Sequence, residues 1–160
     1  MKTPLLALAG ALLVTAAPAT SQDIVVSAES AAVEQISRDL DRNLIAAERP
    51  LRQATGEGIA MVRFQRGADG RPVNVEMYHR SGSSSVDRLA RRAVSGLGRS
   101  TPLPALGGRS QIFQANVIVA NSEREFENLS DKLAKIEKTR LSDPREHAVF
   151  AFTASPRKAS

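Results

Sequence analysis

The sequence predicts an α+β domain in two layers, with a three-stranded antiparallel sheet packed against helices. Two stretches with alternating apolar residues, 57–66 and 72–79, flank a glycine-bounded turn and indicate a β-hairpin. An apolar stripe at helical spacing follows, and then a third alternating stretch at 110–120. We expect the order helix, hairpin, helix, strand, helix, because strands with one apolar face need helices to cover that face.

The composition limits the chemistry that the chain can perform. A chain of 160 residues, 42% hydrophobic and 24% charged, suits a single globular domain. The absence of cysteine excludes disulfides and thiolate metal sites, and two histidines exclude a site with three imidazoles. We therefore expect no metal and no cofactor. The net charge of +5 is concentrated in the middle of the chain, at 59–120.

The N-terminus has the pattern of an export signal. Lys2 precedes an apolar run at 5–19, which is shorter than the roughly 20 residues of a membrane-spanning helix. Ala17 and Ala19 are the small residues that precede a cleavage site, so we predict a signal peptide at 1–19, cleaved after Ala19. A mature chain without cysteine suits the bacterial periplasm. The alternative is an uncleaved anchor in the inner membrane.

The segment 20–57 contains the first predicted helix. Ser30 is its expected N-cap and Pro50 its end. Its apolar residues recur every three or four positions: Val33, Ile36, Leu40, Leu44 and Ala47.

The hairpin places six apolar residues on one face of the sheet. Closure across the turn at 67–70 predicts three cross-strand pairs: Phe64 with Val73, Val62 with Val75, and Ala60 with Met77.

The second half of the chain predicts two further helices and two strands. An unbroken apolar stripe from Val86 to Leu97 indicates a helix, and the strand at 110–120 follows. Ser122 and Glu125 form a capping box at the start of a C-terminal helical segment, 121–146. The last segment, 147–160, predicts a short strand and then a flexible tail.

No constellation of residues indicates an enzyme. His79 and Ser81 are two positions apart and could share a face of an extended strand, but no third residue is placed to orient His79. The acids of the middle block, Asp69, Glu76 and Asp87, suit a turn, a cross-strand pair and a helix start. A hydrolase that uses His79 and Ser81 remains the enzymatic alternative.

A group of arginines could contact a polyanion. Export removes nucleic acid from reach, and Tyr78 is the only aromatic residue expected on the open face of the sheet, so a base-stacking platform is missing. Anionic lipid or lipopolysaccharide is the better polyanion, and a solvated charged face is the simpler interpretation. The arginines are Arg88, Arg91, Arg92, Arg99 and Arg109.

The third strand has the properties of an edge that can take up a peptide. No charged residue occurs at 111–120, and the unpaired backbone groups of an edge strand can template an incoming extended segment. The alternative is that 147–153, 23–26 or the last helix covers this edge within the same chain.

Residues 58–120 resemble the C-terminal domain of the TonB family. The resemblance begins at Gly58 and includes the Asp-Gly turn, a Ser-Gly pair followed by a Val-Asp-x-x-Ala helix start, and a Pro-x-Pro crossover. The motif residues are Asp69, Gly70, Ser81, Gly82, Val86, Asp87, Leu89, Ala90, Pro102 and Pro104.

The resemblance implies a periplasmic binding module and no catalysis. TonB-like domains bind the N-terminal box peptide of outer-membrane transporters as a strand added beside their last strand. In this chain that strand comprises Phe113, Gln114, Ala115, Asn116, Val117, Ile118, Val119 and Ala120. The expected partner is an outer-membrane transporter or another envelope protein.

The chain also departs from the family members that transmit force. Those members have a membrane anchor and a long proline-rich spacer, whereas residues 20–58 predict a helix in place of a spacer. Binding without force transduction is therefore expected. The alternatives are a homodimeric structural protein of the envelope and, if the signal is not cleaved, a short anchored energy transducer.

Overall fold

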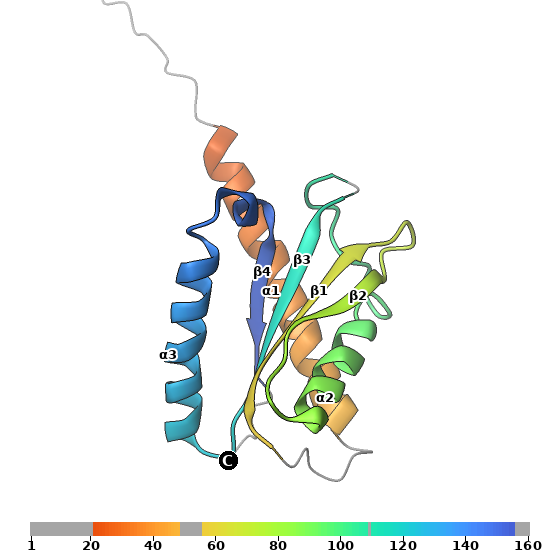
Figure 1. Ribbon diagram of the computed structural model, residues 1–160. Helices are drawn as coiled ribbons and strands as arrows, with labels where there is room; N and C mark the ends of the chain where they lie inside the picture. The colour runs from red at the N-terminus through yellow and green to blue at the C-terminus, as the bar shows by residue number, and fades with distance from the viewer. Residues whose placement is uncertain (1–20, 49–55, 109, 156–160) are drawn as a thin grey trace, which may run out of the picture.

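A computed structural model describes residues 21–48, 56–108 and 110–155 of the chain (Figure 1). The predicted signal peptide, its cleavage site and Arg109 lie outside the described residues. The elements are α1 (Ser21–Glu48), β1 (Gly58–Arg66), β2 (Pro72–His79), α2 (Ser84–Ser95), β3 (Ile112–Val119), α3 (Glu123–Arg140), the short 3-10 helix η2 (Pro144–Ala148) and β4 (Phe150–Ala154).

The sheet has four strands in the order β2-β1-β3-β4, so the α+β class is confirmed but the expected number of three strands is wrong. β1 pairs antiparallel with β2 and β3, whereas β4 pairs in parallel with β3. The parallel pair follows from the connection: α3 has 18 residues, about 27 Å, and returns the chain along the whole of β3. The short strand predicted at 147–153 is found at 150–154, where it completes the sheet, while residues 147 and 148 belong to η2.

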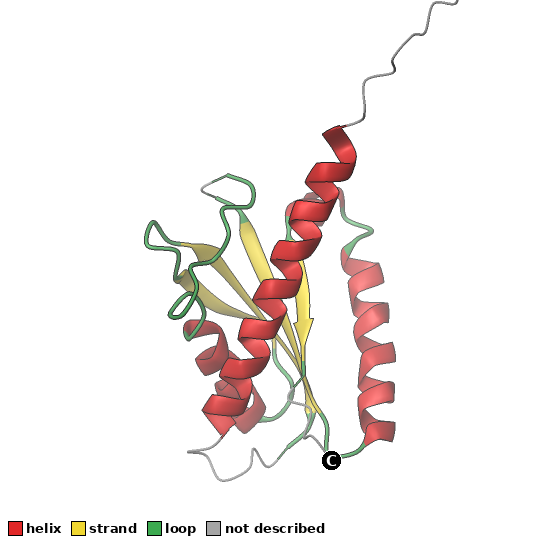
Figure 2. Cartoon of the chain, turned by 180° about the vertical axis from the view of Figure 1, so that it is seen from behind, coloured by secondary structure: helices red, strands yellow, loops and turns green. Residues whose placement is uncertain are grey.

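Helices lie on both faces of the sheet (Figures 1 and 2). α1 and α2 pack on one face, where Leu40, Leu44 and Leu89 are fully buried against the sheet in the main core. α3 packs on the other face through a smaller apolar cluster, in which Leu133 contacts the side chains from β1 and β3. The sequence predicted a two-layer arrangement, and the packing of α3 on the opposite face adds a third layer.

The ends of two helices differ from the sequence prediction. α1 runs from Ser21 to Glu48 and so includes residues before Ser30, its predicted N-cap, while Pro50, its predicted end, lies outside the described residues. α3 begins at the predicted cap, where the Ser122 hydroxyl accepts from the Glu125 amide at 3.2 Å. The reciprocal bond of the predicted capping box is shifted by one residue, since the Glu125 carboxylate accepts from the Asn121 amide at 2.8 Å. α3 ends at Arg140, and η2 occupies the remainder of the segment predicted as helix up to residue 146.

The predicted register of the hairpin is wrong. Val73 pairs with Gln65 instead of Phe64, and Met77 pairs with Val62 instead of Ala60. The register shifts twice along the pair, and Asn74 has a φ of 53°, a conformation in which the strand bulges. The bulge turns Val73 outward, so its side chain is 40% exposed.

Four phenylalanine rings join the strands in the centre of the main core. The rings of Phe64 and Phe113 stack at 5.4 Å between centroids, and Phe152 meets Phe64 edge-on at 6.2 Å. Phe150 lies 6.0 Å from Phe113. Such aromatic pairs stabilise a core beyond their buried area, so β4 is an integral part of the domain.

Removal of the Phe152 ring tests how much the packing of β4 contributes to the stability of the domain. Phe152→Ala should lower the free energy of unfolding by about 3–5 kcal/mol, because the ring is 4% exposed and no other side chain fills its place. Thr153→Ala, at an exposed neighbouring position, should change it by less than about 0.5 kcal/mol. Urea denaturation of both variants measures the difference, and equal small losses would contradict the packing described.

Candidate functional site

The strand predicted to bind a peptide lies in the interior of the sheet. β3 pairs with β1 on one side and with β4 on the other, so neither of its edges is free. Phe113, Ala115, Val117 and Val119 point into the main core, whereas Gln114, Asn116 and Ile118 face α3. The structure thus realises the alternative in which residues 147–153 cover this edge.

The two free edges of the described sheet belong to β2 and β4. β2 is a protected edge: it starts with a proline, bulges at Asn74 and carries the charged side chain of Glu76. β4 has the sequence Phe-Ala-Phe-Thr-Ala, with no charge, no proline and no bulge. By these criteria β4 is the edge at which a further strand can pair.

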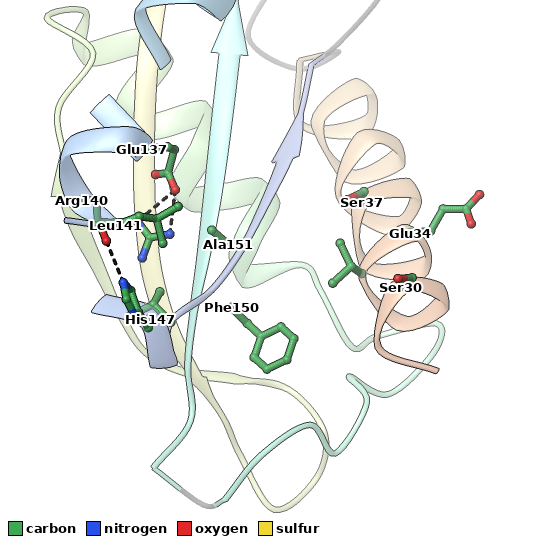
Figure 3. Close-up of a pocket in the computed structure, with 11 residues that line it drawn as sticks. Ser30, Glu34, Ser37, Glu137, Arg140, Leu141, His147, Phe150 and Ala151 are labelled. Atoms are coloured by element: carbon green, nitrogen blue, oxygen red, sulfur yellow. Dashed lines mark hydrogen bonds and ion pairs between the residues drawn. The ribbon is translucent and has the colours of Figure 1, made fainter. Parts of the chain in front are cut away.

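Two hollows lie along β4, between α1 and α3. The larger, about 780 Å³, is lined by Val33 of α1, Leu141 after α3, and Phe150 and Ala151 of β4 (Figure 3). In Figure 3 the ring of Phe150 points toward α1. The smaller, about 360 Å³, lies at the other end of β4 and is lined by Asp41, Ile45, Phe126, Thr153, Ala154 and Ser155.

Exposed apolar side chains accompany this edge. Ile45 is 43% exposed in the smaller hollow and Leu141 is 47% exposed in the larger one. They lie on opposite walls, since Ile45 belongs to α1 and Leu141 caps α3. The edge of β4 is therefore flanked at both ends by side chains that gain from being covered.

The backbone amide just after β4 points away from β3 and forms a hydrogen bond with a side chain of α1. The amide of Ser155 donates to the carboxylate of Asp41 on α1 at 3.1 Å, on the outer side of the strand. Residues two apart in a strand direct their amides to the same side, so those of Ala151 and Thr153 face outward as well. These two residues are the donors that an added strand would meet.

A buried polar network holds the C-terminal elements on the sheet. Gln114, fully buried on β3, donates to Glu137 of α3 at 2.8 Å and accepts from Arg63 of β1 at 2.9 Å. It also donates to Asn116 at 2.9 Å. The network satisfies the polar groups that the sheet presents to α3, which is the condition for burying them.

Glu146 of η2 joins this network and fixes the chain just before β4. Arg63 donates to both of its carboxylate oxygens, at 3.3 and 2.5 Å, while the Arg63 guanidinium stacks on the Tyr78 ring at 3.4 Å. Arg140 donates to the Glu146 carbonyl at 2.7 Å. The bond from Arg63 lowers the pKa of Glu146, and Arg140 lowers it further.

Part of the TonB-like motif stabilises the start of α2. The Asp87 carboxylate accepts from the amide of Ser81 at 2.8 Å and from its hydroxyl at 2.7 Å. The same hydroxyl accepts from the Ser83 amide. Gly82 has a φ of 90°, which a glycine adopts without strain. The Ser-Gly…Val-Asp spacing therefore brings Ser81 and Asp87 into contact and fixes the loop before α2.

The other part of the motif joins the hairpin turn to the crossover. The carbonyl of Gly70 accepts from the Leu103 amide at 2.9 Å, and a side chain on Gly70 would collide with Pro102. Val86, Leu89 and Ala90 are fully buried in the main core. The predicted motif residues accordingly form the scaffold, and none lies along β4.

Ser81, the nucleophile of the enzymatic alternative, is hydrogen-bonded to Asp87, and no hydrogen bond joins it to His79 in the described part of the chain. The Ser81 hydroxyl is within 2.7 Å of the Asp87 carboxylate, a stronger acceptor than an imidazole and one that keeps the hydroxyl in the helix entry. Among the described residues, no three acidic, histidine or cysteine side chains are grouped to hold a metal ion.

The comparisons with known proteins identify the family. The TonB C terminal family matches residues 33–118, which is more than half of the chain. No curated protein and no solved structure matches. The match extends the resemblance seen at 58–120 into α1, whereas α3, η2 and β4 lie beyond it.

The chain belongs to the TonB C-terminal domain family, whose members have transport-related roles in the cell envelope and act by binding rather than by catalysis. Within the described part of the chain, no helix is both long enough and apolar enough to span a membrane.

The Arg63–Glu146 contact should make stability depend on pH. The pKa of Glu146 is lowered in the folded state, so its contribution is complete above its ordinary value of 4.5 and is lost as the pH falls below that value. Glu146→Gln should lower the free energy of unfolding by about 2 kcal/mol at neutral pH. It should also weaken the fall of this free energy with decreasing pH, which is the acid limb of the stability curve. Glu127→Gln, exposed on α3, is the control. Parallel acid limbs for all three proteins would contradict this role.

Proposed function

We propose that this protein is a periplasmic TonB-like module that binds extended peptide segments of envelope proteins by strand addition. The expected partners are outer-membrane transporters, which connect the module to TonB-type transport. The observation that supports this proposal most is the uncharged edge of β4, flanked by two hollows and adjacent to the strand that the family uses.

The added strand pairs with the outer edge of β4. The outward amides of Ala151 and Thr153 supply the backbone hydrogen bonds, and β4 offers five residues of pairing length. Alternate side chains of an added strand point to opposite faces, toward α1 on one side and α3 on the other. The hollows beside Val33 and Ile45 give apolar side chains of the peptide places to bind.

Binding directly to β3 would require β4 to leave. Only then would the backbone of 113–120 become an edge, as in the mode that the family resemblance implies. The peptide would have to replace Phe152 and Ala154, both 4% exposed in the main core. Addition outside β4 preserves this packing, and we therefore favour it over exchange.

A proline in β4 tests the proposed edge. Ala151→Pro removes an outward amide and puts a ring in its place, so it should weaken peptide binding about tenfold or more while the sheet stays folded. Ala151→Val retains the amide and should bind like the wild type. The affinity is measured by fluorescence anisotropy with a labelled synthetic peptide. The peptide has the sequence of the N-terminal box of a transporter from the same host. Undiminished binding by a folded proline variant would contradict the proposal.

A disulfide between β3 and β4 separates addition from exchange. Asn116 and Thr153 are register partners on adjacent strands, which run about 4.8 Å apart, close enough for a disulfide. The chain has no cysteine of its own, so Asn116→Cys with Thr153→Cys introduces a single pair. We expect equal peptide binding by the oxidised and reduced forms. Binding that appears only after reduction would favour exchange at β3.

A homodimer is the second candidate, since Ile45 and Leu141 would also be covered if two β4 edges paired with each other. Light scattering of the purified chain distinguishes the two: a stable dimer that takes up no peptide favours the structural role, and a monomer that binds the peptide favours the module.

The proposed periplasmic location depends on cleavage after Ala19. Mass spectrometry of the protein from its host's envelope should give a chain that begins at Thr20 in the soluble fraction. A full-length chain in the inner-membrane fraction would instead favour a short anchored energy transducer, since an anchored domain can transmit force.

A further inference from the structure

The positive charge of the chain is concentrated around α2. Residues 80–99 contain five arginines and one acid, a net charge of +4 out of +5 for the whole sequence. The acid, Asp87, is engaged with Ser81 at the start of the helix. An uneven distribution of this kind creates a local positive potential that the modest net charge of the chain conceals.

The two faces of α2 differ completely in character. Its inner face is apolar and buried against the sheet and α1. Its exposed stripe contains only serine and arginine: Ser84, Arg88, Arg91, Arg92 and Ser95. Arg80 and Arg99 are also exposed and flank the helix in the chain. The helix has 12 residues, so the stripe extends over about 18 Å.

The arginines of this surface have no carboxylate partner among the described residues, in contrast to several arginines elsewhere in the domain. Arg63 and Arg140 contact Glu146, and Arg145 contacts Asp143. Within the same described ranges, no ion pair involves Arg88, Arg91 or Arg92. We name the surface of Arg80, Arg88, Arg91, Arg92 and Arg99 the arginine face.

We infer that the arginine face docks the domain on a membrane surface rich in anionic phospholipid. The guanidinium group binds phosphate through paired N–H donors, and each basic residue near an anionic bilayer adds about 1 kcal/mol of attraction. The family belongs to the envelope, where phospholipid headgroups form the charged surface nearest to a periplasmic domain. The exposed stripe has no aromatic or aliphatic side chain, so the contact is electrostatic and sensitive to salt.

Docking in this way leaves the proposed peptide edge free. α2 packs beneath β1 and β2, whereas α1 lies between it and β4 at the opposite end of the sheet (Figure 2). A domain resting on the arginine face would therefore present β4 away from the lipid. The inference is independent of peptide binding, and either can fail without the other.

Vesicle co-sedimentation of the exported chain tests the inference. At low salt the protein should bind vesicles of equal parts phosphatidylcholine and phosphatidylglycerol, and should not bind phosphatidylcholine alone. Arg88→Gln, Arg91→Gln and Arg92→Gln together should lower the partition coefficient about a hundredfold, because each arginine contributes about a fivefold factor. The matched control replaces Lys132, Lys135 and Lys138 of α3 by Gln, which removes the same charge from the other face of the sheet.

The control variant should retain most of the binding, because its changes lie away from the contact surface. Equal losses in the two triple variants would overturn the inference, since net charge alone would then explain the binding. Equal sedimentation with both kinds of vesicle would overturn it too. Tighter binding to a short DNA duplex or to lipopolysaccharide micelles, lost in the same arginine variant, would reassign the face to that polyanion. Circular dichroism confirms that both variants are folded.

Discussion

The parallel pairing of β4 with β3 is the constraint on which the rest of the molecule depends. It makes β3 an interior strand, moves the free edge outward by one strand, and brings Phe150 and Phe152 into the aromatic core. α3 connects β3 with β4 and is about as long as β3, so it returns the chain to the start of β3 and the next strand runs in parallel. A module of this family that ended after β3 would present a different edge to its partners.

The buried polar network makes this arrangement durable. Gln114 and Asn116 would be costly to bury alone, yet α3 and η2 supply the partners that they need. Arg63 joins β1 to Glu146 only four residues before β4 begins. The same polar contacts therefore hold α3 on the second face of the sheet and place β4 beside β3. The extension beyond the family match serves both purposes, leaving the outer edge of β4 as the unprotected one.

Local patterns predicted most of the elements, and long-range contacts account for what they missed. The apolar stripe of α2, the helix cap at Ser122 and the hairpin of β1 and β2 depend on neighbouring residues, and all three are present. The hairpin register failed because a bulge at Asn74 leaves no trace in the alternation of apolar residues. The sequence left open whether 147–153 covers the edge of the third strand, because strand pairing depends on long-range contacts that local patterns do not record. A strand, an 18-residue helix and a second strand in succession were the available signal for a parallel neighbour.

The most direct measurement is amide hydrogen exchange of the chain from Thr20 onward, with and without the transporter peptide of the binding assay. Strand addition outside β4 predicts slower exchange at the amides of Ala151 and Thr153, with the amides of β3 as protected as before. The opposite pattern, faster exchange throughout 150–154 when the peptide binds, would mean that β4 is expelled and would contradict the account.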